Sequence, residues 1–72
     1  MMTKYKSLQA CLDAVAQELN CDVSDLRPIE GPYCGIGIDY WYSGPARNSP
    51  AVWVHEHNGE FLWATVVEAV AA

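Results

Sequence analysis

Hydrophobic positions near the start of the chain recur with the spacing of an amphipathic helix. Between Ser7 and Asn20 the apolar residues lie three or four positions apart, so a helix would carry them as one stripe. The stripe consists of Leu8, Cys11, Leu12, Val15 and Leu19. Ser7 suits the N-cap, with Thr3 as an earlier alternative, and Asn20 can adopt the left-handed conformation that ends helices. The pattern therefore predicts a helix over Ser7–Asn20.

The segment Tyr33–Ser43 has the β-branched and aromatic content of a strand. Alternation along an extended chain divides its side chains between two faces. One face would carry Cys34, Ile36, Ile38, Tyr40 and Tyr42. The other would carry Gly35, Gly37, Asp39 and Trp41. The first face is the more apolar, and we predict that it packs against the helix stripe.

Ala51–Thr65 reads as a β-hairpin, because Asn58-Gly59 separates two runs of strand-forming residues. A two-residue type I′ turn fixes the register and pairs His57 with Glu60 across the hairpin. The predicted core face consists of Val52, Val54, Phe61, Trp63 and Thr65. The predicted open face consists of Trp53, His55, His57, Glu60, Leu62 and Ala64.

The remaining segments read as connections around these elements. Asp22–Pro32 is a connector with one helical turn at Ser24–Leu26, and Ser43–Pro50 is a loop rich in proline and glycine. Val66–Ala72 would either extend the last strand or form a short C-terminal helix. Residues 1–72 are thus predicted to form a single small α+β domain. We expect an N-terminal helix packed on a three-stranded antiparallel β-meander, in the order α-β-β-β.

Composition and charge narrow the classes of function. Hydrophobic residues make up 51% of the chain, which provides ample material for a core and argues against disorder. Nine acidic and four basic residues give a net charge of −5, so we expect no direct binding to nucleic acid. No signal peptide or membrane-spanning run is recognisable. An odd count of three cysteines without a Cys-x-x-Cys pair favours a reduced, cytoplasmic location, and we expect no association with membranes.

The residues with the clearest potential for metal binding are His55, His57 and Glu60. A His-x-His pair on a strand places both imidazoles on one face, about 7 Å apart, with Glu60 across the hairpin and Asp39 on the same face. The alternative is two exposed histidines in a cross-strand ion pair with Glu60. A Cys2His2 site from the cysteines and histidines is disfavoured, because its spacing is irregular and Cys34 should face the core.

Catalytic signatures are missing from the sequence. No nucleophile elbow, phosphate-binding loop or paired-carboxylate cleft is recognisable, and Gly35-x-Gly37 is a strand feature with no helix start after it. An aromatic ring such as that of Trp41 or Trp53 would lie over those glycines. We therefore expect no enzymatic activity and no cofactor.

Protein binding is the leading functional hypothesis. The acidic residues that would contact a partner are Asp13, Glu18, Asp22, Asp25 and Glu30, and the aromatic ones are Trp41 and Trp53. Acidic side chains fit a basic surface, including one that normally holds nucleic acid, as in phage or mobile-element inhibitors with an anti-CRISPR-like role. This comparison is with a general class of small acidic proteins, because no motif in the sequence identifies such a family. Alternatively, the acidic residues only form a solvated surface with no partner. The two tryptophans would alternatively be covered by the connector or by the C-terminal segment.

Two further hypotheses stay open. One is the metal-binding or sensing module of the hairpin. The other is an accessory subunit or a homodimer formed through the open face or a sheet edge.

Overall fold

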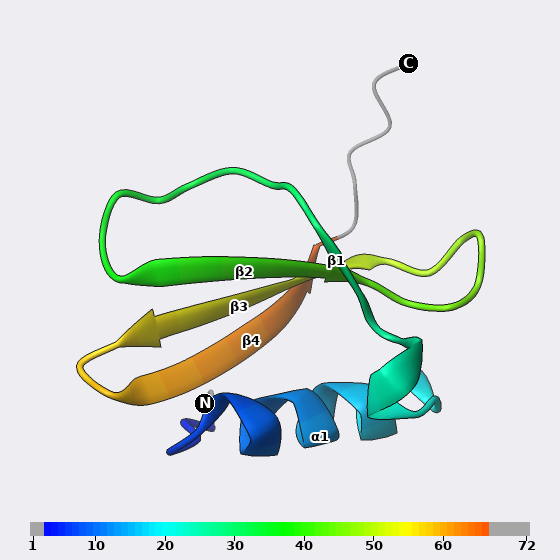
Figure 1. The fold of residues 1–72 in the computed structure, drawn as a ribbon, viewed down its shortest axis with the longest axis horizontal. Coiled ribbons are helices and arrows are strands. Elements are labelled where there is room, and N and C mark those ends of the chain that lie inside the picture. The colour runs from blue at the N-terminus through cyan, green and yellow to red at the C-terminus, as the bar shows by residue number, and fades with distance from the viewer. Residues whose placement is uncertain (1–2, 67–72) are drawn as a thin grey trace.

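The computed structural model describes residues 3–66, in which one helix packs against a four-stranded antiparallel sheet (Figure 1). The elements are α1 Leu8–Leu19, the 3-10 turn η1 Val23–Asp25, β1 Arg27–Ile29, β2 Ile38–Ser43, β3 Ala51–His57 and β4 Glu60–Val66. The strands follow one another in space in the order β1-β2-β3-β4. The α+β class and the antiparallel meander are confirmed, with four strands in place of the predicted three.

Helix α1 begins and ends where its sequence predicts. The Oγ of Ser7 accepts a hydrogen bond from the backbone N–H of Ala10 at 3.1 Å. At the other end Asn20 adopts the left-handed conformation with φ 57°. Cys11, Val15 and Ala16 are buried against the sheet, and burial raises the pKa of the Cys11 thiol to about 11. The helix is therefore capped at both ends and held on its apolar side.

The hairpin β3–β4 has the predicted turn and the predicted register. Asn58 and Gly59 both have positive φ, at 56° and 79°, as a type I′ turn requires. His57 lies opposite Glu60, and Trp53 lies opposite Ala64. The core side of this hairpin holds Val52 and Val54, both at 0% exposure, with Phe61 and Trp63 packed around them. Thr65, predicted for the same face, is exposed near the end of β4.

Truncation of this core gives a first prediction. Val54→Ala should lower the free energy of unfolding by about 2–3 kcal/mol, because it removes two buried carbon atoms and leaves a cavity beneath α1. Val66→Ala is the matched control at a residue that is 38% exposed, and it should cost less than about 1 kcal/mol. Urea denaturation of both variants measures the difference; equal losses would mean that Val54 is not in the core.

The strand before the hairpin begins later than its sequence suggests. Tyr33–Gly37 is a loop, because Gly35 and Gly37 have φ of 91° and 67°, which an extended strand cannot accommodate. Tyr40 and Tyr42 do pack on the core. Ile36 and Ile38, by contrast, are 62% and 50% exposed. Their predicted place on the core face is wrong, and the same holds for Cys34, which is exposed.

The connector contains a strand that the sequence does not signal. Its helical turn is η1 at Val23–Asp25, one residue earlier than predicted, and β1 at Arg27–Ile29 then pairs with β2. Pro28 lacks an N–H, but at the edge of a sheet this loss is tolerated. Leu26, between the two, is 8% exposed and belongs to the core.

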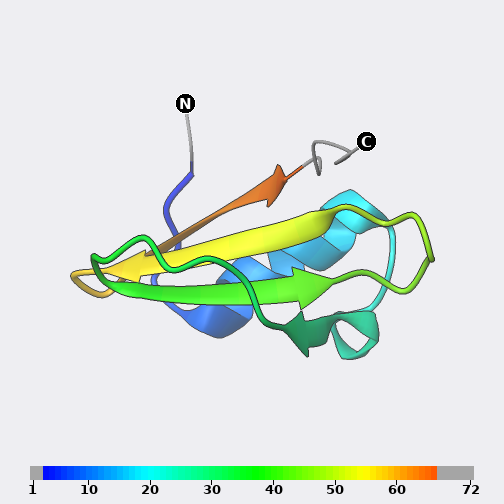
Figure 2. The ribbon, with the colours of Figure 1, turned by 90° about the horizontal axis from the view of Figure 1, so that it is seen from above.

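The two faces of the sheet are covered differently. Helix α1 covers one face, and residues 30–37 cross the other as a loop between β1 and β2 (Figures 1 and 2). We call the second face the open face and residues 30–37 the strap. Within residues 3–66 no helix is long and apolar enough to cross a lipid bilayer. The short C-terminal helix considered for Val66–Ala72 lies outside the described residues, apart from Val66, which ends β4.

Candidate functional site

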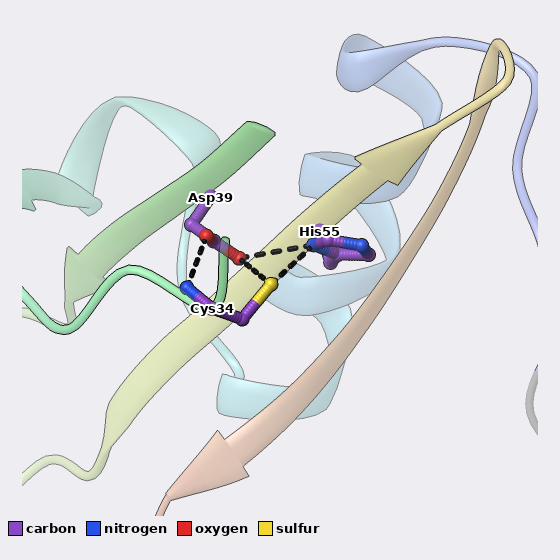
Figure 3. A group of neighbouring side chains, drawn as sticks. All are labelled: Cys34, Asp39 and His55. Atoms are coloured by element: carbon purple, nitrogen blue, oxygen red, sulfur yellow. Dashed lines mark hydrogen bonds and ion pairs between the residues drawn. The ribbon is translucent and has the colours of Figure 1, made fainter. Parts of the chain in front are cut away.

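On the open face, the carboxylate of Asp39 lies beside Cys34 and His55 (Figure 3). β2 places Asp39 directly opposite His55 of β3, and the Asp39 side chain is 3% exposed. Its Oδ1 accepts a hydrogen bond from Trp53 Nε1–H at 2.8 Å and lies 2.9 Å from His55 Nδ1. Its Oδ2 accepts a hydrogen bond from the backbone N–H of Cys34 at 2.9 Å, and the Cys34 thiol lies 3.4 Å from Oδ1. Asp39 thus joins β2, β3 and the strap.

These donors keep Asp39 charged. The backbone N–H of Cys34, followed by the side chains of His55, Trp53 and Cys34, lowers the pKa of the Asp39 carboxyl well below its usual range. Desolvation, the second-largest single effect on this pKa, acts in the opposite direction and is outweighed by the hydrogen bonds together. The open face therefore holds a nearly buried carboxylate that is ionised at neutral pH.

His55 sits in a row of stacked rings. Its imidazole lies 5.1 Å from the Trp53 ring, centroid to centroid, at an interplanar angle of 26°. On its other side the His57 ring lies 6.4 Å away at 20°. Nδ1 of His55 is also 3.7 Å from Sγ of Cys34. Stacking and hydrogen bonding together fix both the plane of the ring and the direction in which Nδ1 points.

The predicted hairpin metal set is only partly brought together. His55 and His57 stack side by side, but the carboxylate of Glu60 forms ion pairs with Lys4 and Lys6, each at 3.5 Å. Glu60 thus pairs with lysines in place of the histidine expected across the hairpin. Asp39 takes the carboxylate position beside His55, as its register with β3 suggested.

A groove of about 510 Å³ runs beside this cluster. It is lined by Lys4, Cys34, Ile36, His55, His57, Asn58, Glu60, Phe61 and Leu62. The exposed side of Cys34 and the exposed ring of His57 both face solvent here. A small ligand or water in this groove can therefore contact Cys34 and His55 directly.

The two tryptophans expected as docking anchors make intramolecular contacts. Trp41 Nε1–H donates to the carbonyl oxygen of Pro32 at 2.8 Å, and its ring lies directly over Gly31, where a Cβ would overlap it. Trp53 donates to Asp39. Both rings are half-buried. The aromatic ring that we expected over Gly35 and Gly37 thus lies over Gly31, and the end of the connector covers Trp41.

The predicted acidic residues are all exposed, and four of them lie together along the chain. Residues 8–26 contain four of the nine acids, Asp13, Glu18, Asp22 and Asp25, and none of the four Lys and Arg residues. Glu30 lies farther along, in the strap. Desolvation, followed by the charges of Asp25 and Asp22, raises the pKa of the nearby Cys21 thiol. We call the four acids of residues 8–26 the acidic face.

The sequence-based reasoning missed Cys34 as a neighbour of Asp39 and His55. The available signal was Gly35-x-Gly37, since two glycines can reverse the chain direction as well as lie flat in a strand.

Comparison with family models, curated proteins and solved structures finds no match for this chain.

Proposed function

We propose that this protein is a non-enzymatic binding protein that docks its acidic face on a basic surface of a protein partner. The observation that carries the proposal is the separation of charge along the chain. Residues 8–26 account for −4 of the net charge of −5, and the other residues nearly balance, with five acids against four bases. A field of one sign over one part of the molecule steers a basic partner and orients it on arrival.

The scaffold beneath the acidic face supports this role. α1 is capped by Ser7 and Asn20, and its opposite side is buried, so Asp13 and Glu18 project from a fixed element. η1 continues the same charge, and Asp25 also closes this turn by accepting the N–H of Asp22 at 3.1 Å. Charges held on ordered backbone lose less entropy on binding than charges on a mobile tail.

The geometry of the open face supports the non-enzymatic part of the proposal. In a nucleophile–histidine–acid relay, the nucleophile and the acid contact different nitrogens of the imidazole. Here Cys34 Sγ and Asp39 Oδ1 both approach Nδ1 of His55, at 3.7 and 2.9 Å. The acid therefore occupies the nitrogen that a Cys34 nucleophile would need.

The most concrete form of the proposed function is inhibition of a host nucleic-acid-handling complex by a phage or mobile-element protein. A groove that binds nucleic acid is lined with Lys and Arg, and carboxylates on a helix present the same sign of charge as phosphates. The partner would lose access to its nucleic acid while the acidic face is docked.

Removal of charge from the acidic face tests the proposal. The variant Asp13→Asn, Glu18→Gln, Asp22→Asn retains Asp25, which closes η1. Immobilised wild-type protein should retain a partner from a lysate of its own cells or host cells at low salt, and the triple variant should retain at least about tenfold less. Quantitative mass spectrometry of the eluates measures the ratio.

A second triple variant controls for net charge alone. Thr3→Lys, Tyr33→Lys and Thr65→Lys changes the net charge by the same +3, at exposed positions outside residues 8–26. It should retain most of the partner. Equal loss in both variants would assign the effect to overall charge, and full retention by both would contradict docking through the acidic face.

A further inference from the structure

Three side chains with metal-binding atoms meet on the open face from three separate parts of the chain. Cys34 comes from the strap, Asp39 from β2 and His55 from β3 (Figure 3). Sγ lies 3.4 Å from Oδ1 and 3.7 Å from Nδ1, and Oδ1 lies 2.9 Å from Nδ1. Within residues 3–66 these are the side chains of the metal-binding types that form a group of three with ligand atoms inside 4.8 Å.

This triangle of atoms is close to one face of a zinc coordination tetrahedron. Zinc bonds of about 2.3 Å to sulfur and about 2.0–2.1 Å to nitrogen and oxygen give edges of roughly 3.5 Å for S–O and S–N and roughly 3.3 Å for O–N. The observed separations of 3.4, 3.7 and 2.9 Å differ from these edges by no more than about 0.4 Å. We propose that Cys34, Asp39 and His55 bind a zinc ion through Sγ, Oδ1 and Nδ1.

The donor set favours zinc over other common divalent cations. A thiolate and an imidazole are poor ligands for Mg²⁺ and Ca²⁺, which require oxygen. One thiolate and one carboxylate neutralise the two positive charges of the ion. This matters because the side chains of Asp39 and His55 are only 3% and 13% exposed.

Neighbouring groups hold the ligands in place, and the Cys34 thiol also lies 3.2 Å from the carbonyl oxygen of Ile36. Trp53 Nε1–H fixes the Asp39 carboxylate, and the Trp53 ring stacks on His55. The Cys34 backbone N–H donates to Oδ2, whereas Oδ1 accepts the Trp53 hydrogen bond and also faces the thiol and the imidazole. Such supporting contacts orient ligands and raise metal affinity.

Metal binding exchanges protons for the ion and transfers no electrons. The S–H of Cys34 releases its proton to solvent, and the thiolate binds zinc. A neutral His55 that carries its proton on Nδ1 moves it to Nε2, so that Nδ1 is free to coordinate. One proton is thus released per zinc bound, and zinc affinity falls as the pH is lowered. Cys34 and His55 also line the groove beside His57, through which water can reach these two ligands.

Zinc and cobalt titrations of the reduced, metal-free full chain test this site. Isothermal titration calorimetry should give one zinc per chain with micromolar or tighter affinity. Co²⁺ should produce thiolate-to-cobalt charge-transfer absorption. Cys34→Ser should remove that absorption and weaken zinc binding by at least about 100-fold, since even the loss of a supporting contact costs 10–100-fold.

Two matched variants keep the outcome decisive. Cys21→Ser removes a partly exposed thiol elsewhere on the surface and should leave both signals unchanged. His57→Ala should change zinc affinity by less than about tenfold, because His57 supplies no atom to the cluster. Absence of stoichiometric binding, or binding that survives Cys34→Ser, overturns the site. Loss in His57→Ala with retention in Cys34→Ser would place the metal on the hairpin, and would equally overturn it.

Discussion

Gly37→Ala is expected to release the strap from the sheet and to destabilise the protein by about 2–4 kcal/mol. Gly37 has φ 67°, which side chains other than glycine rarely adopt, and a Cβ there would overlap the carbonyl oxygen of Glu56. It would also come within 3.1 Å of the His55 ring. The obstruction is backbone, so no rotation of a side chain relieves it. Chemical denaturation gives the loss of stability.

Gly35→Ala separates the clash from the backbone conformation. Gly35 also has positive φ, at 91°, but a Cβ there meets nothing within 4 Å. This variant should cost only about 1–2 kcal/mol from backbone strain. A cost equal to that of Gly37→Ala would mean that Gly37 does not lie against β3.

Asp39→Asn is expected to open the strap at least about tenfold more often, because an amide cannot accept all the hydrogen bonds that the carboxylate accepts. The NH2 group of the asparagine would take the place of one carboxylate oxygen. It would then face either the Cys34 N–H or the Trp53 and His55 donors, and could not accept their hydrogen bonds. Each donor left without an acceptor is penalised. Limited proteolysis in the strap and hydrogen exchange of the Cys34 amide measure the opening. Asp13→Asn, on the exposed side of α1, is the matched control and should leave both rates unchanged.

The same variant predicts a pH dependence. The donors around Asp39 lower its pKa in the folded state below the value of about 3.9 for an unfolded chain. Between these two values the unfolded state binds more protons, so stability rises with pH. The contribution is complete above about pH 5 and is lost as the pH falls through the folded pKa. Urea midpoints of wild type and Asp39→Asn should therefore converge as the pH is lowered from 7 toward 2; a constant difference would contradict a low pKa.

The elements with strong local signals were predictable from the sequence. The helix followed from its apolar spacing and its caps, and the register of the hairpin followed from Asn58-Gly59. Both depend on interactions between residues that are near one another in the chain. The edge strand β1 did not follow, because three residues that include Pro28 carry no periodicity, and pairing with β2 alone defines them.

The candidate metal site was predictable only in part. Alternation and register placed Asp39 and His55 on one face, but the same alternation assigned Cys34 to the core. The chain departs from alternation at Gly35 and Gly37, whose positive φ turns the strap back over the sheet. A glycine pair is compatible with either path. The hydrogen bond from Cys34 to Asp39, a tertiary contact, identifies the path that is taken.

The proposed docking of the acidic face is tested most directly by the affinity for the captured partner as a function of salt. Calorimetry with the purified partner should show that wild-type affinity decreases as salt is raised, and that the Asp13→Asn, Glu18→Gln, Asp22→Asn variant binds more weakly with a shallower salt dependence. The variant with Thr3→Lys, Tyr33→Lys and Thr65→Lys should bind with nearly wild-type affinity. Unchanged affinity and an unchanged salt dependence in the acidic-face variant would contradict docking through α1 and η1.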